Sequence, residues 1–213
     1  MLIRTLFWLS AAIVTAIAMA LVVVITVIWP DLPPISEVQD IRLKEPLRIY
    51  SIDGKLMGEF GDERRITVRI EDTPQDLINA ILAAEDDRFF SHHGVDPLGV
   101  VRALIANLKS RETRQGASTI TMQVARNYFL SREKTYTRKL KGALLAFRLE
   151  RELLKLQILE LYVNKIFLGH RSFGFQAAAA FYYNRPLDEL TLAQLAMLAG
   201  LPKAPSSINP VSN

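Results

Sequence analysis

The sequence predicts a mainly α-helical domain that carries a small β-hairpin and follows an N-terminal transmembrane helix. Three observations support this fold class. An uncharged apolar run lies near the N-terminus, a short segment alternates apolar and polar residues, and apolar residues recur at helical spacing through most of the chain after residue 73. With 213 residues, the chain has room for one membrane segment and one domain of ordinary size.

The apolar run covers residues 6–29 and contains no Asp, Glu, Lys or Arg. A helix of about 24 residues is roughly 36 Å long, which is enough to cross a bilayer. Trp8 and Trp29 lie near its ends, where indole rings prefer the membrane interface. The alternative, a cleaved signal peptide, would have an apolar core of about 7–15 residues and a small-residue cleavage site. We therefore predict a cytoplasmic tail over residues 1–5, an uncleaved anchor over 6–29, and a following domain outside the cytoplasm.

The segment after the anchor changes character twice. Residues 30–46 contain four prolines and are expected to form an extended linker. Residues 48–60 then alternate apolar side chains around Asp53-Gly54, a dipeptide that is typical of hairpin turns. We therefore expect the domain to occupy residues 47–213 and to begin with a β-hairpin.

The rest of the domain is predicted to be helical. Thr73-Pro74 opens the first helix, because proline is favoured at the first helical position. Apolar spacing predicts further helices over residues 97–109, 118–130, 138–167 (as one helix or two), 177–183 and 190–201.

The predicted helix at 97–109 carries its apolar residues on one stripe, with Arg102 and Lys109 at the edges. The stripe consists of Leu98, Val101, Leu104, Ile105 and Leu108. Burial in the core is the usual role of such a stripe, but a short amphipathic helix with basic edges can instead dip into a membrane interface. Both interpretations stay open from the sequence.

The net charge of +4 is modest but unevenly distributed. Residues 102–151 contain twelve Lys or Arg against three Asp or Glu, a surplus of nine (12 − 3). Such a surplus indicates an anionic partner, with a solvated helix face as the plain alternative. Nucleic acid is disfavoured, because the nearest anions to an anchored domain are lipid headgroups and lipid phosphates. The absence of Cys excludes disulfides and thiolate chemistry.

Five motifs carry the functional prediction. The first contains Glu85 at the end of the apolar run 77–83, and a carboxyl held at the edge of a core binds its proton more tightly, as a general base requires. In chain order the motifs are Glu85-Asp86-x-x-Phe89-x-x-His92-x-Gly94; Gly116-x-Ser118-Thr119-Ile120-Thr121-x-Gln123-x-x-Arg126-Asn127; Arg138-Lys139 with Ala146 and Leu149-Glu150; residues 158–169; and residues 174–183 followed by 201–205 and Asn209-Pro210.

Taken together, the five motifs resemble the glycosyltransferase domain of bacterial peptidoglycan polymerases. This is glycosyltransferase family 51, which comprises the class A penicillin-binding proteins and the monofunctional transglycosylases. The resemblance covers residues 49–209 and implies a lysozyme-like bilobal fold on the periplasmic side of the bacterial inner membrane. By the resemblance, we expect the domain to be truncated at Asn213, before its final helices, and we expect no transpeptidase domain within residues 1–213.

The resemblance also implies a substrate and a reaction. Lipid II, a disaccharide-pentapeptide on undecaprenyl pyrophosphate, is added to a growing glycan chain. The C4 hydroxyl of an acceptor sugar attacks C1 of the donor with inversion, and the lipid pyrophosphate leaves. The implied partners are lipid II, the glycan chain, the membrane and other cell-wall synthesis proteins. No cofactor is required, with a divalent cation (Mg²⁺ or Mn²⁺) as the alternative.

By the same resemblance, Glu85 is the catalytic base. The implied substrate-binding residues are Asp86, Phe89, His92, Ser118, Thr119, Gln123, Arg126, Asn127, Arg138, Lys139 and Lys203, and no residue is implied as a metal ligand. The cations of this set would hold the diphosphate, and the polar groups at the start of a helix would add neutral hydrogen bonds. For His92 and Asn127 a purely structural role is the plainer alternative.

One departure from the family pattern bears on activity. The third motif is expected to continue Arg-Lys-x-x-Glu, with a second catalytic carboxylate that assists the leaving group, but the sequence has Gly142 there. Glu150, eight residues further along a helix, would lie about 12 Å away and cannot substitute. Two alternatives to a polymerase follow. One is a non-catalytic scaffold of the same fold that binds lipid II or partner proteins, and the other is a lysozyme-like hydrolase that uses one carboxylic acid.

Overall fold

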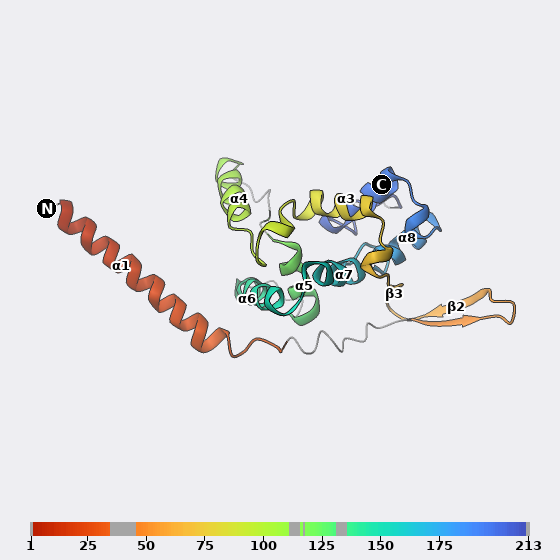
Figure 1. Cartoon of the computed structure of the whole chain (residues 1–213), viewed down its shortest axis with the longest axis horizontal. Coiled ribbons are helices and arrows are strands. Elements are labelled where there is room, and N and C mark those ends of the chain that lie inside the picture. The colour runs from red at the N-terminus through yellow and green to blue at the C-terminus, as the bar shows by residue number, and fades with distance from the viewer. Residues whose placement is uncertain (1, 35–45, 111–115, 117, 131–135, 212–213) are drawn as a thin grey trace.

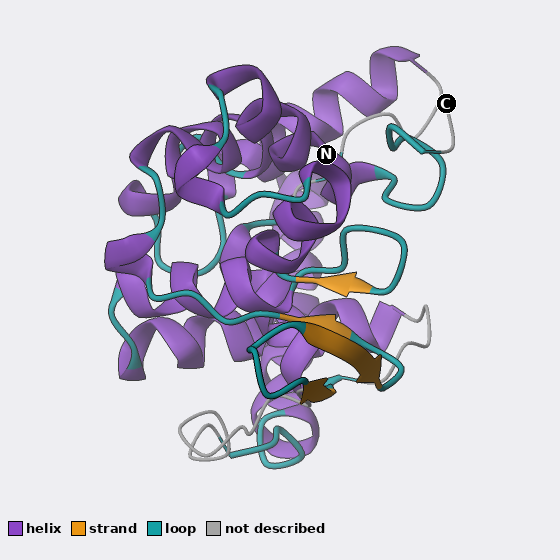
Figure 2. Ribbon diagram, turned by 90° about the vertical axis from the view of Figure 1, so that its right-hand side faces the viewer, coloured by secondary structure: helices purple, strands orange, loops and turns teal. Residues whose placement is uncertain are grey.

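The computed structural model describes residues 2–34, 46–110, 116, 118–130 and 136–211, and it confirms a mainly helical chain (Figure 1). The described helices are α1 (Leu2–Val23), α3 (Gln75–Glu85), α4 (Pro97–Ser110), α5 (Ile120–Phe129), α6 (Tyr136–Glu152), α7 (Lys155–Lys165), α8 (Phe175–Tyr183) and α9 (Leu192–Gly200). The strands are β1 (Leu47–Tyr50), β2 (Leu56–Phe60), β3 (Arg64–Arg65) and β4 (Ser172–Phe173). They form a small part of the molecule beside the helices (Figure 2).

Helix α1 continues into a π-helical turn at Val24–Ile28. Within the described ranges, none of the helices combines the length and the apolar character needed to cross a membrane. The structure therefore does not show the anchor predicted over residues 6–29. Most of the predicted linker, residues 35–45, lies outside the described residues.

The predicted hairpin is confirmed. Strands β1 and β2 pair antiparallel, with Leu47 opposite Phe60. Gly54 adopts φ +78°, a left-handed conformation that glycine reaches without strain, and the N–H of Ser51 donates to the carbonyl of Lys55 at 2.8 Å. A second sheet, in which β3 pairs parallel with β4, was not predicted from the sequence.

The predicted helices are present, with small shifts at their ends. Pro74 is the N-cap residue of α3 rather than its first helical residue. The stretch predicted as one helix or two is two, α6 and α7, and Leu154 begins α7 in an extended conformation. No side chain caps α7 at Leu154, but Oε1 of Gln157 accepts the N–H of Leu154 at 2.8 Å. This contact satisfies one donor at the helix start.

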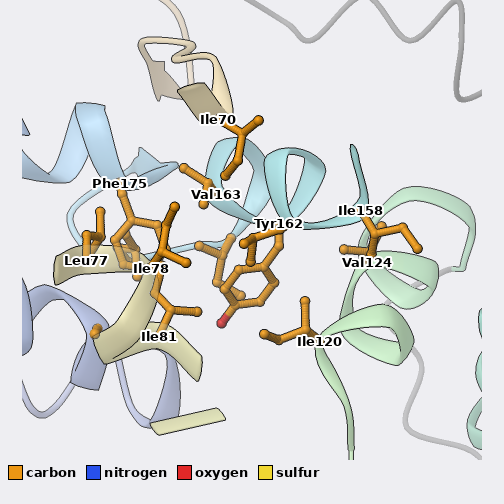
Figure 3. Close-up of a cluster of buried hydrophobic side chains, with 14 of the residues drawn as sticks. Ile70, Leu77, Ile78, Ile81, Ile120, Val124, Ile158, Tyr162, Val163 and Phe175 are labelled. Carbon is orange, nitrogen blue, oxygen red and sulfur yellow. The ribbon is translucent and has the colours of Figure 1, made fainter. Parts of the chain in front are cut away.

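Helix α7 runs through the centre of the core. Its apolar residues Ile158, Leu159, Tyr162 and Val163 are at most 1% exposed. Around them pack the buried faces of α3 and α5, so that side chains from several helices interdigitate (Figure 3). The packing contributes most of the stability of such a domain and fixes the C-terminal end of α3 relative to α5.

Helix α4 confirms the predicted amphipathic pattern but not its burial. Leu98 is 66% exposed, Leu104 58% and Leu108 71%, whereas Ala103 on the opposite side is buried. The core interpretation of this stripe is therefore wrong: α4 contacts the domain through small residues and turns its large apolar side chains outward. Figure 1 shows the helix standing apart from the central bundle.

Asn164 on α7 connects the segment before α3 to the core by side-chain hydrogen bonds. Its Nδ2 donates to the carbonyl of Val68 at 2.8 Å and to that of Glu160 at 3.0 Å. Its Oδ1 accepts the N–H of Val68 at 2.9 Å. An asparagine amide can donate and accept at once, so this one buried side chain satisfies both the N–H and the carbonyl of Val68.

We expect the substitution Asn164→Ala to lower the free energy of unfolding by about 2–4 kcal/mol, because it leaves buried backbone groups without partners. The matched control is Asn79→Ala, which removes an exposed amide bonded to Gln75 and is expected to change stability by less than about 0.5 kcal/mol. Urea unfolding of both variants measures the difference. Equal effects would contradict the fastening role of Asn164.

Candidate active site

Glu85 is the last residue of α3, and its side chain is half-buried. Nε2 of Gln123, on α5, donates to Oε2 of Glu85 at 2.6 Å. The bond holds the carboxylate against α5, and within the described part of the chain its other oxygen makes no hydrogen bond. A half-buried carboxylate in a fixed orientation has the form that a general base requires.

Asp86 joins the end of α3 to the start of α5. Both of its carboxylate oxygens lie 3.0 Å from Nε2 of His92, and Oδ2 also accepts the N–H of Ile120, the first residue of α5, at 3.0 Å. An anionic group at a helix N-terminus satisfies a free N–H donor and interacts favourably with the helix dipole. Asp86 and His92 are both buried. Asp86 thus fixes the distance between the two elements that carry Glu85 and Gln123.

The start of α5 is capped by Thr119. Its Oγ1 accepts the N–H of Met122 at 3.1 Å and donates to the carbonyl of Gly94 at 2.5 Å. Gly94 adopts φ +87°, and a Cβ atom there would lie 2.7 Å from the backbone of Ala146 on α6. The first and second motifs are therefore tied together by a loop that approaches α6 too closely for any side chain.

A cleft of about 670 Å³ opens beside Glu85. Its polar lining comes from four regions of the chain: Glu85, Asp86 and Asp87; Arg102; Ser118, Gln123 and Arg126; and Lys203. The base predicted from the sequence and two of the predicted cations, Arg126 and Lys203, thus share one cleft.

A second cleft of about 680 Å³ adjoins the first, since Arg126 and Pro202 line both. The second cleft also contains Asn127 and Arg138, two more of the predicted substrate-binding residues. Nη1 of Arg126 donates to Oγ of Ser118 at 3.1 Å, which aims the guanidinium at the boundary between the clefts.

The electrostatics at this boundary favour an anion. Burial, and then the like charge of Arg138, lower the pKa of the Arg126 guanidinium. No ion pair between Arg126 and an Asp or Glu occurs within the described part of the chain. A cation that is partly desolvated and near a second cation is stabilised when a phosphate or carboxylate binds between them.

Gly142, on α6, packs directly against Arg126. A Cβ atom built on Gly142 would lie 3.1 Å from Cγ of Arg126 and 3.5 Å from its Cδ. Glu150 is engaged elsewhere, since its Oε1 accepts hydrogen bonds from Oγ1 of Thr121 at 2.6 Å and from Nζ of Lys155 at 2.7 Å. This agrees with the expectation that Glu150 does not replace a carboxylate at position 142.

Four predicted substrate-binding residues line neither of these two clefts. One of them, Thr119, instead caps the start of α5. Phe89 is 1% exposed and packs in the core under Nζ of Lys155, which lies 4.4 Å from the centre of its ring. His92 is engaged with Asp86, and Lys139 is exposed on α6. For Phe89 and His92 the geometry favours a supporting role behind Glu85 over direct contact with substrate, since both side chains point into the domain.

The comparison with known proteins decides the family. The sequence model of the transglycosylase family matches residues 53–213. The chain belongs to this family. It is 47% identical over 212 residues to penicillin-binding protein 1A of Pseudomonas aeruginosa, which covers 100% of this chain and 26% of the relative. The corresponding protein of Escherichia coli K12 is 50% identical over 184 residues, covering 86% of this chain and 22% of the relative.

The chain therefore spans about a quarter of the length of the curated relatives it matches. Among solved structures, it is similar to penicillin-binding protein 1A from Haemophilus influenzae, determined at 2.6 Å resolution. That likeness has 34% sequence identity and a TM-score of 0.41, and it covers 81% of this chain and 16% of the other.

The two clefts also include cations that the sequence analysis did not single out as site residues. Arg102 lines the first cleft, with Nη1 3.6 Å from Oδ2 of Asp87. Lys165 and Arg171 line the second. The basic surplus over residues 102–151 pointed to Arg102, whereas Lys165 and Arg171 follow that run and are brought in by the fold. In the described ranges, no group of three His, Asp or Glu side chains gathers as a metal site, and the divalent-cation alternative stays a prediction.

We expect Asp86→Ala to lower the free energy of unfolding by about 2–4 kcal/mol, since it leaves the N–H of Ile120 and the ring of His92 buried without their anionic partner. Asp86→Asn keeps one acceptor oxygen and should cost less. The control Asp87→Ala removes an exposed carboxylate and should cost about 0–1 kcal/mol. Chemical denaturation of the three variants measures this order, and an Asp86→Ala variant as stable as Asp87→Ala would refute the linking role.

Proposed function

We propose that this chain is the glycosyltransferase part of a peptidoglycan polymerase that adds lipid II to a growing glycan strand. One observation carries the proposal: the carboxylate of Glu85 and the guanidinium of Arg126 line the same cleft, which adjoins a second cleft of similar size. Joining two sugars requires space for an acceptor and a donor on either side of the base. Membership of the transglycosylase family supports the same reaction.

In the proposed reaction, Glu85 removes the proton from the C4 hydroxyl of the acceptor sugar as that oxygen attacks C1 of the donor. The bond between C1 and the diphosphate oxygen breaks, and the electron pair leaves with the lipid pyrophosphate. Arg126 and Arg138 stabilise the negative charge that grows on the leaving group, and Lys203 reaches the same region from the end of α9. Side-chain cations thus supply the charge stabilisation, and we propose no required cofactor.

We further propose the lysozyme-like bilobal arrangement and a location at the periplasmic surface of the bacterial inner membrane. The undecaprenyl tail of lipid II keeps the substrate in a bilayer. The exposed stripe on α4, with Arg102 and Lys109 at its edges, matches an amphipathic surface that meets anionic lipid. The anchor over residues 6–29 and contacts with other cell-wall synthesis proteins remain proposals of the same kind.

The test of the reaction is polymerisation of purified lipid II by the full chain, followed by electrophoresis of the glycan strands. We expect Glu85→Gln to lower the rate about 10²–10⁴-fold, because general-base catalysis contributes a factor of that size. The control Glu152→Gln neutralises a carboxylate at the end of α6 that lines neither cleft and should leave the rate within about twofold. Full activity in Glu85→Gln would overturn the assignment of the base.

A second candidate function, a non-catalytic binder of lipid II, is favoured by Gly142. The site has no carboxylate at this position, and the stem of Arg126 occupies the adjoining space. A glutamate would push Arg126 aside by a few tenths of an ångström and would bring a carboxylate beside the cations that face the leaving group. A chain of this kind binds the diphosphate of lipid II but lacks the carboxylate that would assist departure of the pyrophosphate leaving group.

The variants Gly142→Glu and Gly142→Gln separate the two functions. Both add the same bulk against Arg126, but the charge comes with glutamate alone. If the chain is a binder, we expect no polymer from the unmodified chain or from Gly142→Gln, and polymer from Gly142→Glu. Polymer from the unmodified chain would exclude the binder, and an increase of about 10²-fold in Gly142→Glu would then measure the missing assistance.

The α4 surface is tested with fluorescent labels, since the chain contains no Cys. We expect a polarity-sensitive dye on Leu104→Cys to shift to shorter wavelength in vesicles containing anionic lipid, and to be quenched by spin-labelled lipid. The same dye on Leu192→Cys, an equally exposed position at the start of α9, should show neither effect. A dye at residue 104 that stays in water would exclude contact with the bilayer.

A further inference from the structure

A largely buried ion pair lies at the junction of α6 and α7, and the proposed reaction does not use it. Nζ of Lys155, the first residue of α7, donates to Oε1 of Glu150, near the end of α6, at 2.7 Å. The two side chains are 19% and 5% exposed. Neither residue lines one of the two clefts beside Glu85. Any effect of the pair on the reaction therefore reaches the site from behind the clefts.

The location of the pair is unfavourable for stability alone. Lys155 stands at the N-terminus of a helix, where the helix dipole disfavours a cation. A buried ion pair also loses its hydration, and it often stabilises a fold no more than well-packed apolar side chains do. Stability therefore does not explain why these two charges stand here, whereas a requirement for fixed geometry does.

Glu150 connects the pair to the start of α5. The oxygen that accepts from Lys155 also accepts from Oγ1 of Thr121 at 2.6 Å. Thr121 is the second residue of α5 and is fully buried. The carboxylate thus holds the first turn of the helix that carries Gln123, the residue that donates to Glu85.

Lys155 connects the pair to the loop after α3. Its Nζ donates a second hydrogen bond, to the carbonyl of His92, at 2.7 Å and lies 4.4 Å from the centre of the Phe89 ring. The imidazole of His92 hydrogen-bonds through Nε2, to the carboxylate of Asp86, whereas within the described residues its Nδ1 has no hydrogen-bond partner. The orientation of the imidazole therefore depends on the backbone of His92, and Lys155 holds that backbone by its carbonyl.

These contacts form a closed polar circuit. It runs from Asp86 through His92, Lys155 and Glu150 to Thr121, whose neighbour Ile120 donates its N–H back to Asp86. Three of the elements that it joins, α5, α6 and α7, pack against one another (Figure 1). Connected polar groups in a protein interior hold one another in place, because moving one leaves the next without its partner.

We propose that Lys155 and Glu150 are positioning residues for Glu85, the base. Lys155 holds the loop after α3, and Glu150 holds the first turn of α5. The hydrogen bond from Gln123 that orients the base joins the same two elements, so its geometry depends on an ion pair that lines neither cleft. The catalytic part of this inference rests on the proposed function, whereas the coupling of Lys155 to His92 does not.

The first test follows the Nε2 proton of His92 by NMR in the full, ¹⁵N-labelled chain. The chain contains three His, and the signal is assigned by its loss in His92→Gln. In Lys155→Met, which removes the charge and keeps an unbranched side chain, we expect this proton to exchange with water about tenfold faster, because its bond to Asp86 opens more often. The control Arg148→Met removes a cation from the same part of α6, 3.7 Å from Glu152, and should leave the rate unchanged.

Backbone amides of α9 serve as the internal reference in the same spectra, since α9 is outside the circuit. A loss of global stability would speed exchange in α9 as well, whereas a local positioning role speeds it at His92 alone. An unchanged His92 proton in Lys155→Met, or equal acceleration in α9, would overturn the proposal.

Thr121 offers a milder pair of variants for the case in which Lys155→Met does not fold. Thr121→Val keeps the shape of the side chain and removes the donor to Glu150, whereas Thr121→Ser keeps the donor and removes a methyl group. We expect the side-chain amide protons of Gln123 to exchange about tenfold faster in Thr121→Val, and at the unmodified rate in Thr121→Ser. Equal effects in both variants would assign the role to packing and refute the one proposed for Glu150.

Polymerisation of lipid II provides the catalytic readout. We expect Lys155→Met to lower kcat about tenfold and to leave KM within about twofold, because the base is misplaced while the residues that line the clefts are unchanged. The double variant Lys155→Met/Glu150→Gln should lose no more than Lys155→Met alone, since the two residues act as one unit. A higher KM with unchanged kcat, or losses that multiply, would contradict a positioning role.

The exchange measurements and the polymerisation assay fail separately. If neither the unmodified chain nor Gly142→Glu forms polymer, the proposed function fails. Exchange at His92 and Gln123 then still decides whether the ion pair holds the two elements that carry the site.

Discussion

The geometry of the site depends on the carboxylate of Asp86. This one group accepts the first N–H of α5 and binds the ring of His92, so it connects the end of one helix to the start of another. Glu85 is the neighbouring residue, and Gln123 lies one turn into α5. The hydrogen bond between them therefore follows from how Asp86 is held. A buried carboxylate held by these contacts is a rigid connection, because moving either helix would leave a carboxylate oxygen or an N–H without a partner.

The second constraint is the placement of positive charge. Arg126 is partly buried, its own pKa is lowered by burial and by Arg138, and it lines both clefts. Such an arrangement is unfavourable in the free domain and becomes favourable when an anion binds, which is how binding energy can be directed at a diphosphate. Gly142 lies beside the stem of Arg126, and a Cβ atom there would be 3.1 Å from Cγ of Arg126, so the stem would have to move by a few tenths of an ångström.

The sequence predicted the elements well where a period or a turn residue determines them. Apolar spacing located the helices of the domain, and Asp53-Gly54 located the hairpin. The pairing of β3 with β4 was not predicted, because two residues per strand carry no period. The stripe on α4 shows the same limit, since a helical period identifies an apolar face but does not say what covers it.

For the site, the sequence analysis predicted a set of residues that includes Glu85, Arg126 and Lys203, and the structure places these three in one cleft. It could not separate side chains that face the cleft from those that face the core. Phe89 and Tyr162 have the apolar and aromatic character of either location, and only the packing of α3, α5 and α7 decides. This distinction matters because the residues behind a catalytic group fix its orientation and its proton affinity, and those in front of it bind the substrate. Phe89 belongs to the first class, which makes the core beneath Glu85 as much a part of the site as the cleft above it.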